Sequence, residues 1–230
     1  MRITVFGANG LTGRLLTEQA LAAGHEVAAV TRRPDSFPLQ HDQLEVVGAD
    51  VLDPAAADLA VAGRDAVLST LGVPAGKKPI STYSRGVINI VAAMRRHRVR
   101  RLAVVSSTGV DPQPYSDGGI LFNRVFLPYV TRVLGKTLYD DMRRMEALVR
   151  DSGLDWTIVR PSGLYHLPAV TDYTVVEGQA DGRFTARADL AASLLALLDD
   201  RHLRRTVSVI TTVGNPTLLQ WIRREALAKP

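Results

Sequence analysis

Three glycines at three-residue spacing, Gly7, Gly10 and Gly13, follow an apolar run that ends at Phe6, and a helical pattern follows them. In a nucleotide-binding βα unit the first glycine permits the tight turn, the second lets the backbone approach a pyrophosphate, and the third lets the helix lie against the strand. The helix N-terminus then faces the anion. The pattern predicts a dinucleotide-binding loop, with a plain βα turn as the alternative.

The rest of the chain alternates short apolar runs with longer segments of helical period, which is typical of parallel α/β proteins. The predicted strands cover residues 3–6, 26–31, 44–47, 66–70, 102–106 and 156–160. Helical patterns cover residues 11–21, 87–94 and 142–149. Together they predict an α/β fold with a Rossmann-type, doubly wound parallel sheet.

We expect residues 1–230 to form a single domain, in which residues 1–161 are the nucleotide-binding core. Residues 162–230 are expected to supply substrate-side elements and a terminal helix, including strands at 172–177 and 206–211. An apolar, aromatic stretch at residues 120–134 interrupts the alternation, and we expect it to be either a lid over a substrate site or a subunit interface.

The chain has 230 residues, a net charge of +5 and no cysteine, which excludes disulfides, cysteine–zinc sites and thiol nucleophiles. Its five histidines lie far apart in sequence, so we predict no metal site. The arginine cluster at residues 95–101 is interpreted as a solvated helix end. A nucleic-acid binder is the less favoured alternative, because no aromatic residue interleaves with these arginines.

Too few apolar residues precede Gly7 for a signal peptide or a membrane span. We therefore expect a cytoplasmic monomer or homodimer that binds a small-molecule substrate, and neither nucleic acid nor a membrane.

The end of the second predicted strand indicates the type of dinucleotide. An NAD enzyme usually has an acidic residue there to bind the ribose 2′-OH, whereas this chain has Arg32 and Arg33. Guanidinium groups suit a 2′-phosphate, so NADP(H) is favoured, although Arg33 is also explained as a surface residue. Asp50 and Val51, after the third strand, suit an adenine ring, with a turn or helix cap as the alternative role of Asp50.

Five motifs resemble those of the atypical short-chain dehydrogenase/reductases, in the NmrA-like NAD(P)H-binding group. They are GANGLTG at residues 7–13, TRRP at 31–34, GADV at 48–51, VVSST at 104–108 and SGLDWTIVRP at 152–161. The resemblance spans roughly residues 1–212, and within the group it is nearest to the biliverdin-IX-beta reductases, also known as flavin reductases.

The resemblance implies a full set of NADP(H)-binding residues. The pyrophosphate would be bound by Gly7, Asn9, Gly10, Leu11 and Thr12, next to Gly13. Arg32, with Arg33 beside it, would bind the 2′-phosphate, and Asp50 and Val51 the adenine. Leu71, Gly72, Tyr83 and Ser106 would continue along the cofactor.

The sequence lacks the Tyr-x-x-x-Lys pattern with which carbonyl-reducing members of this superfamily donate a proton. Its nearest string runs from Tyr139 to Arg143, where a guanidinium supplies charge but no proton shuttle. We predict Tyr139 as the proton donor. The alternative is a half-buried aromatic residue beside two solvated carboxylates.

Other catalytic candidates follow the fifth and sixth strands. Ser107 and Thr108 are predicted to orient the nicotinamide or the substrate by hydrogen bonding. The chain departs from the flavin-reductase pattern at Gly109 and Gly163, where that family has serine and histidine. Tyr165 and His166 lie close enough to Pro161 to reach the substrate site instead.

These features predict an NADPH-dependent oxidoreductase that transfers hydride to a small conjugated or carbonyl substrate, such as a flavin, quinone or tetrapyrrole. A flat conjugated acceptor delocalises charge, so its reduction requires orientation more than a tuned acid. The alternative is a redox sensor of the NmrA kind, which binds NADP and catalyses nothing.

Overall fold

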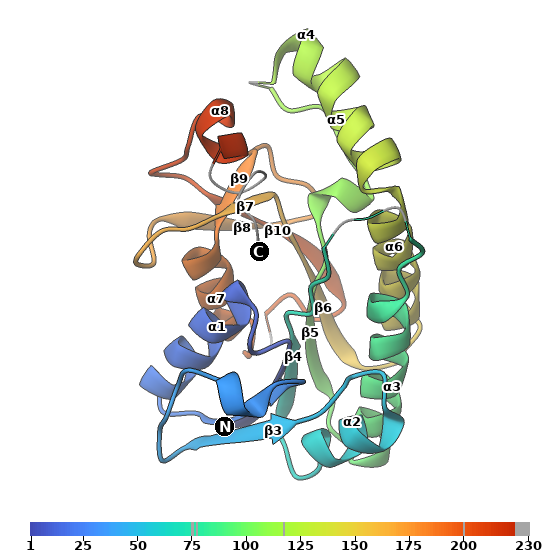
Figure 1. Cartoon of the computed structure of the whole chain (residues 1–230), viewed down its shortest axis with the longest axis vertical. Helices are drawn as coiled ribbons and strands as arrows, with labels where there is room; N and C mark the ends of the chain where they lie inside the picture. The colour runs from blue at the N-terminus through green and yellow to red at the C-terminus, as the bar shows by residue number, and fades with distance from the viewer. Residues whose placement is uncertain (75, 77, 117, 200, 224–230) are drawn as a thin grey trace.

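An eight-stranded, mostly parallel sheet forms the centre of the protein (Figure 1). The structure is a computed structural model that describes residues 1–74, 76, 78–116, 118–199 and 201–223. The strand order is β3-β2-β1-β4-β5-β6-β10-β8, in which only the β10–β8 pair is antiparallel. The strands are β1 (Arg2–Phe6), β2 (Glu26–Thr31), β3 (Leu44–Gly48), β4 (Ala66–Ser69), β5 (Arg101–Val105), β6 (Asp155–Pro161), β8 (Tyr173–Glu177) and β10 (Arg205–Thr211). The predicted Rossmann-type, doubly wound sheet is confirmed.

Helices cover both faces of this sheet. On one face, α1 (Leu11–Ala22) packs against α7 (Arg187–Ala196). On the other face lie α2 (Pro54–Val61), α3 (Thr82–Arg96) and α6 (Lys136–Arg150). A separate two-stranded parallel sheet of β7 (Gly163–Tyr165) and β9 (Phe184–Ala186) lies beyond β6. The C-terminal third therefore contributes β10 and α7 to the central layers as well as the small sheet.

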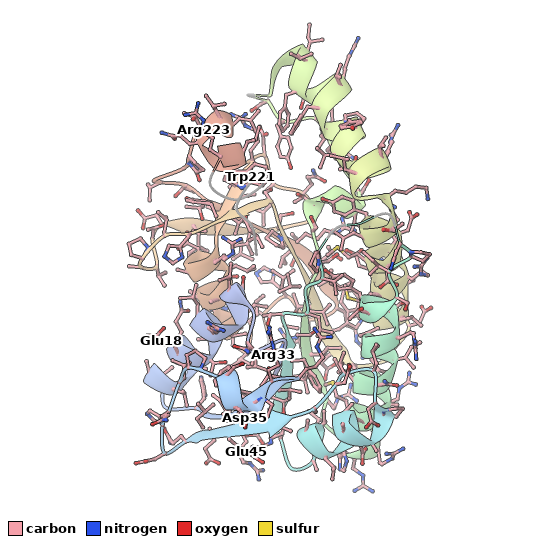
Figure 2. All side chains as sticks on the ribbon, viewed as in Figure 1. Glu18, Arg33, Asp35, Glu45, Trp221 and Arg223 are labelled. Atoms are coloured by element: carbon pink, nitrogen blue, oxygen red, sulfur yellow. The ribbon has the colours of Figure 1, made fainter. Side chains whose placement is uncertain are left out.

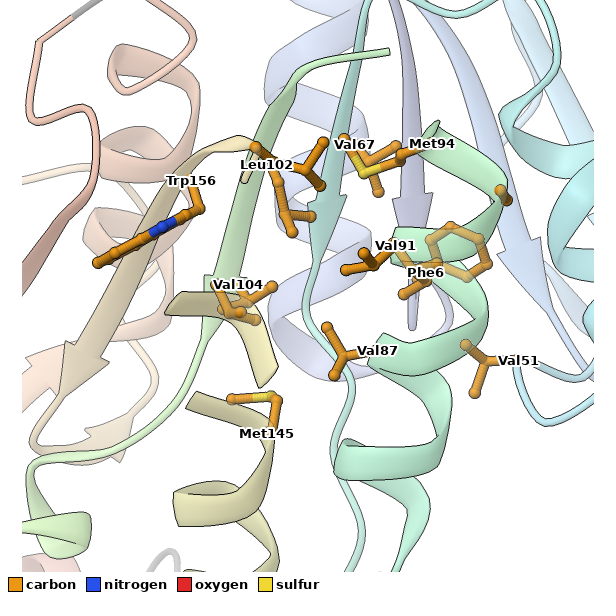
Figure 3. Packing of buried hydrophobic residues seen from close by; sticks show 14 of the residues in the cluster. Phe6, Val51, Val67, Val87, Val91, Met94, Leu102, Val104, Met145 and Trp156 are labelled. Atoms are coloured by element: carbon orange, nitrogen blue, oxygen red, sulfur yellow. The ribbon is translucent and has the colours of Figure 1, made fainter. Parts of the chain in front are cut away.

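The strands are apolar along their length because both faces of the sheet are covered. Figure 3 shows Val67, Leu102 and Val104 of the sheet in contact with side chains of α3 and α6, among them Val91 and Met145. None of the helices in the described parts of the chain is long and apolar enough to span a bilayer.

Arg101 corrects the interpretation of residues 95–101 as a solvated helix end. α3 ends at Arg96, and Arg101 begins the central strand β5 with only 7% of its surface exposed. Its guanidinium donates to the backbone oxygen of Leu197 (2.9 Å), the backbone oxygen of Asp155 (2.8 Å) and Oγ1 of Thr157 (2.9 Å). The buried cation is stabilised by oxygen acceptors from distant parts of the chain instead of by water. Because these acceptors are far away in sequence, the local sequence pattern does not indicate that Arg101 is buried.

A buried carboxylate ties α6 to the ends of β5 and β6. Glu146 is 1% exposed and accepts hydrogen bonds from Ser106 Oγ (2.7 Å), Arg160 Nη2 (2.6 Å) and Arg150 Nη2 (2.7 Å). Burial opposes ionisation, but the hydrogen bonds and charge of Arg160, with those of Ser106 and Arg150, lower the pKa of Glu146 below its ordinary value of 4.5. The network fixes the backbone at the point where β5 ends.

Glu146→Gln is expected to lower the free energy of unfolding by about 3 kcal/mol near pH 7, because two guanidiniums lose their buried carboxylate. Because the pKa of Glu146 is lower in the folded state, its stabilising contribution to the free energy of unfolding is fully present above the ordinary carboxyl pKa. The contribution is lost as the pH falls through the folded-state pKa. The difference from wild type should therefore shrink in acid.

Urea unfolding near pH 7 and near pH 3.5 measures both effects. Glu45→Gln is the control, since Glu45 is exposed and pairs with Arg64 at the surface, and it should change stability by less than about 0.5 kcal/mol. An equal cost of Glu146→Gln at both pH values would contradict the assignment.

Candidate active site

The glycine loop brings the start of α1 against the end of β1. Gly7 has a φ of +78°, and a Cβ added there would lie 2.7 Å from the backbone oxygen of Thr70. A Cβ on Gly13 would lie 2.3 Å from the backbone oxygen of Gly7. Only glycine fits at these two positions, as the sequence predicts.

The N-terminus of α1 is open to an anion. Its N-cap residue is Gly10, no side chain caps it, and no acidic residue lies in its first turn. The N–H groups of the first turn of a helix lack intrahelical acceptors, and they lie at the positive end of the helix dipole. This end of α1 suits an anion such as a pyrophosphate, and binding of that group by Leu11 and Thr12 stays a prediction.

The turn after β2 lies beside this loop. Asn9 connects the two, since its Oδ1 accepts from Arg14 Nε at 2.9 Å and its Nδ2 lies 3.4 Å from Ser36 Oγ. Arg32 and Arg33 are both exposed on this turn, and within the described part of the chain neither guanidinium forms an ion pair. Figure 2 shows Arg33 close to the short helix that carries Asp35.

The predicted adenine side lies after β3. Asp50 makes a turn, because its Oδ1 accepts the N–H of Leu52 at 2.9 Å, whereas Asp53 caps α2 by accepting the N–H of Ala55 at 2.9 Å. The turn role of Asp50 is therefore present, and its contact with adenine stays a prediction.

Val51 and Leu71 pack together beneath this part of the site. A Cβ on Gly86 would lie 3.1 Å from Val51 and 3.2 Å from Leu71, so α3 approaches both closely. Gly72 follows Leu71 at the surface, and a Cβ added there would meet no atom within 4 Å, which leaves the backbone accessible to a ligand. Their cofactor contacts are predictions that this arrangement allows.

Two of the predicted cofactor residues use their hydroxyls within the protein. Tyr83 is 2% exposed and accepts the N–H of Val73 at 3.2 Å, and burial raises its pKa to about 12. Ser106 donates to Glu146. Both hydroxyls therefore support the loops at the carboxyl edge of the sheet, and direct cofactor contacts by these residues stay predictions.

A cavity of about 520 Å³ lies beyond the carboxyl ends of β5 and β6. Its polar lining includes Ser107, Thr108 and Tyr139. Its apolar side is formed by Phe122, Phe126, Leu127, Val130, Phe184 and Trp221. Trp221 is labelled at the top of Figure 2, on α8 (Leu218–Trp221). The structure thus brings all three predicted catalytic residues to one cavity.

Ser107 and Tyr139 both line this cavity. Ser107 Oγ accepts the N–H of Gly109 at 3.1 Å, which starts a short turn after β5. Burial raises the pKa of Tyr139, and a hydrogen bond with the Ser107 side chain opposes the rise. Thr108 Oγ1 lies 3.4 Å from the hydroxyl of Tyr115, on the other side of the turn.

Two glycines form a slot for the Tyr139 ring. A Cβ on Gly109 would lie 2.4 Å from Cε1 of Tyr139, and a Cβ on Gly135 would lie 2.5 Å from Cε2. The ring therefore occupies space that a side chain at either position would need. This explains the departure at Gly109 from the serine of the flavin-reductase pattern.

The residues around Tyr139 correct one expectation. Asp141 is not solvated: it is fully buried and accepts the backbone N–H of Tyr83 at 2.9 Å, at the N-terminus of α3. Arg143 does not replace the missing lysine, because its guanidinium donates to the backbone oxygen of Val110 (2.8 Å) and to Asp140 (2.8 Å).

Tyr165 and His166 do not line the cavity, contrary to expectation. Tyr165 is buried with its hydroxyl 3.1 Å from Asn215 Oδ1, and His166 is exposed. Gly163 and Leu164, earlier in the same strand, do line the cavity, so the departure is confined to Tyr165 and His166.

Sequence reasoning missed the side of the cavity that β9 and the start of α7 supply. Arg183 lies with its Cζ 5.5 Å from the ring centre of Phe122 and 5.7 Å from that of Phe184, and Arg187 also lines the cavity. In the sequence, the pair Gly182 and Arg183 resembles the family in its position along the chain. That position does not reveal that Arg183 lies at the cavity.

Comparison with known proteins agrees with this geometry. The sequence pattern of a family described as NAD(P)H-binding matches residues 7–201. The chain belongs to this NAD(P)H-binding family. The sequence-based expectation of an NAD(P)H-binding family is thereby confirmed.

Similar proteins include an uncharacterised protein of Mycobacterium tuberculosis, 31% identical over 161 residues, or 70% of this chain and 14% of the relative. The chain thus spans about a seventh of that relative's length. The (4-alkanoyl-5-oxo-2,5-dihydrofuran-3-yl)methyl phosphate reductase of Streptomyces griseus is 31% identical over 159 residues, or 69% of this chain and 46% of the enzyme.

Solved structures share the fold. A short-chain dehydrogenase/reductase of Veillonella parvula in complex with NADP has a TM-score of 0.77 and 20% identity, covering 94% of this chain and 96% of its own. ChuY, an anaerobillin reductase of Escherichia coli O157:H7, has a TM-score of 0.74 and 22% identity, covering 94% and 100%.

Gly109→Ala is expected to lower the free energy of unfolding by about 1–3 kcal/mol, because the new methyl group overlaps the Tyr139 ring. Removing the ring should relieve the overlap, so Gly109→Ala should cost less in a Tyr139→Ala background. Denaturant unfolding of the two single variants and the double variant measures this coupling.

Gly72→Ala is the control, because open space surrounds that position. Additive effects of Gly109→Ala and Tyr139→Ala would contradict a slot built around the ring.

Proposed function

We propose that the protein is an NADPH-dependent reductase that transfers hydride to a small conjugated or carbonyl substrate. One observation carries the proposal: Ser107 and Tyr139 adjoin in an aromatic-lined cavity at the carboxyl edge of the sheet, the edge that also carries the glycine loop. Ligands of doubly wound proteins bind at this edge. The reductase activities of the Streptomyces griseus relative and of ChuY support the reaction class.

The residues at the glycine loop and after β2 fit NADP(H), which supplies the hydride when it is bound. The α1 N-terminus would bind the pyrophosphate. Arg32 would bind the 2′-phosphate through charge-assisted hydrogen bonds, and no acidic residue stands at this position to repel that group.

Arg32→Glu is expected to abolish the preference for NADPH over NADH, with kcat/KM for NADPH falling roughly tenfold to a hundredfold, because a charged hydrogen bond is replaced by repulsion. Binding of the two dinucleotides and steady-state kinetics measure the change. Arg33→Glu should have the smaller effect.

Arg205→Glu is the charge-matched control, since Arg205 is at the opposite edge of the sheet, where β10 begins. An unchanged NADPH preference in Arg32→Glu would show that the 2′-phosphate is bound elsewhere.

Tyr139 and Ser107 would complete the reaction by handling the proton. A phenol is protonated at neutral pH at its ordinary pKa, and burial raises the pKa of Tyr139 further, so its O–H is present to donate to an oxygen or nitrogen that gains charge in the substrate. Ser107 would orient the phenol and the substrate. The slot of Gly109 and Gly135 holds the ring in a single position for this step.

Tyr139→Phe is expected to lower kcat at least about tenfold with little change in KM for a carbonyl substrate, because the proton donor is lost while the cavity shape is kept. Wild-type activity should decline only at alkaline pH, as the phenol ionises above its ordinary pKa, and the variant should lack this decline. Kinetics from about pH 6 to about pH 11.5 measure both.

Tyr129→Phe, on an exposed part of the chain, is the control. Full activity of Tyr139→Phe would show that Tyr139 is not the proton donor. Hydride transfer to flavins or quinones would remain consistent with that result, because water can supply the proton for these acceptors.

The guanidinium of Arg143 is held by Val110 and Asp140, so it is not available as a cationic partner for Tyr139. This observation favours a second candidate function, an NADP-binding sensor that catalyses no reaction. Turnover separates the candidates. Oxidation of NADPH with any member of a panel of flavins, quinones, tetrapyrroles and carbonyl compounds supports the reductase, whereas tight NADPH binding without oxidation across the panel supports the sensor.

A further inference from the structure

A helical arm, residues 119–134, projects beyond the rest of the fold at the top of Figure 1. It consists of α4 (Gly119–Leu121), η3 (Phe122–Phe126), α5 (Leu127–Tyr129) and η4 (Val130–Leu134), of which η3 and η4 are π-helical. This is the segment that the sequence predicts as a lid or an interface.

The arm has two apolar faces, and the residues that the structure describes cover only one of them. Phe122, Phe126 and Val130, at four-residue spacing, line the cavity. The next row faces outward, where the exposed surface is 74% for Leu121, 58% for Val125, 51% for Tyr129 and 61% for Val133. A contiguous apolar surface of this kind marks an interaction site.

The polar groups of the outward face are cationic. Arg124 and Arg132 lie beside the apolar row, and both are exposed. Neither forms an ion pair with any residue that the structure describes. The sequence has no Asp or Glu between residues 118 and 139, so the arm itself offers these arginines no partner.

Apolar side chains, a tyrosine and arginines on one exposed helical surface are complementary to the interface of an anionic bilayer. A second copy of the chain fits less well. Two-fold contact would bring Arg124 and Arg132 toward the same residues of the other arm, with no carboxylate on either arm to neutralise them.

We propose that the outward face of the arm docks on the surface of an anionic membrane, with Leu121, Val125, Tyr129 and Val133 inserted into the headgroup region and the two arginines at the phosphates. This would be peripheral binding, and it departs from the sequence-based expectation of no membrane partner, which stays a prediction. The proposal is independent of the proposed reductase activity, although the inward face of the same arm lines the cavity.

Cosedimentation of the whole protein with vesicles tests the proposal. Binding is expected with vesicles of phosphatidylcholine containing about one third phosphatidylglycerol, and should weaken with added salt and with pure phosphatidylcholine. Arg124→Gln/Arg132→Gln should weaken binding roughly tenfold or more, and Val125→Ser/Val133→Ser should weaken it as well.

Leu59→Ser and Arg205→Gln are matched controls, because Leu59 is 75% exposed on α2 and Arg205 is exposed on β10, both away from the arm. Both should bind like wild type, and far-UV circular dichroism confirms that each variant is folded. NADPH binding should be unchanged in the Arg124→Gln/Arg132→Gln variant, which separates membrane docking from the reductase proposal.

Three results would overturn the proposal. They are no binding of the wild-type protein to anionic vesicles, binding by the arm variants as strong as that of wild type, or a loss of binding in the control variants as large as in the arm variants. Sedimentation velocity without vesicles identifies the competing occupant, since a dimer that Val125→Ser/Val133→Ser dissociates would assign the face to a second copy.

Discussion

The contact between the first turn of α1 and the end of β1 sets the arrangement on which the site depends. Gly13 lies so close to the backbone oxygen of Gly7 that a single methyl group would separate helix and strand. The contact directs the uncapped N-terminus of α1 to the carboxyl edge of the sheet. Because β2 and β4 flank β1 in parallel, the loops that follow them lie at the same edge. This packing brings the residues that we propose to bind the dinucleotide to one edge of the sheet.

A second constraint holds the reactive part of the site. Glu146 on α6 binds Ser106 at the end of β5 and Arg160 on β6, so three elements meet at one buried carboxylate. Ser107 follows immediately in the chain, and Tyr139 lies on the helix that carries Glu146. The network around Glu146 therefore holds the backbone that carries Ser107 and Tyr139, the two residues proposed to handle the proton. Glu146 itself does not line the cavity.

The strands and the main helices could be predicted because burial on both faces of a parallel sheet leaves a direct record in the sequence. The sequence-based predictions of exposure were wrong where a polar residue is buried and hydrogen-bonded to protein groups instead of to water. Arg101 and Asp141 both looked exposed in sequence, yet each is buried against backbone groups of a distant element. Likewise, proximity to Pro161 placed Tyr165 and His166 near the site, but the Tyr165 hydroxyl lies against Asn215 and His166 is exposed, so neither lines the cavity.

The sequence by itself determined the glycine loop, the order of strands and helices, and Arg32 in place of an acidic residue, because each of these depends on neighbours within a short stretch of chain. Only the tertiary structure decided the cavity. The slot for Tyr139 requires Gly109 and Gly135 on opposite sides of one ring, and the aromatic wall joins Phe122 to Trp221. Such contacts depend on how α6, the arm and α8 pack around the sheet, and local periodicity carries no record of that packing.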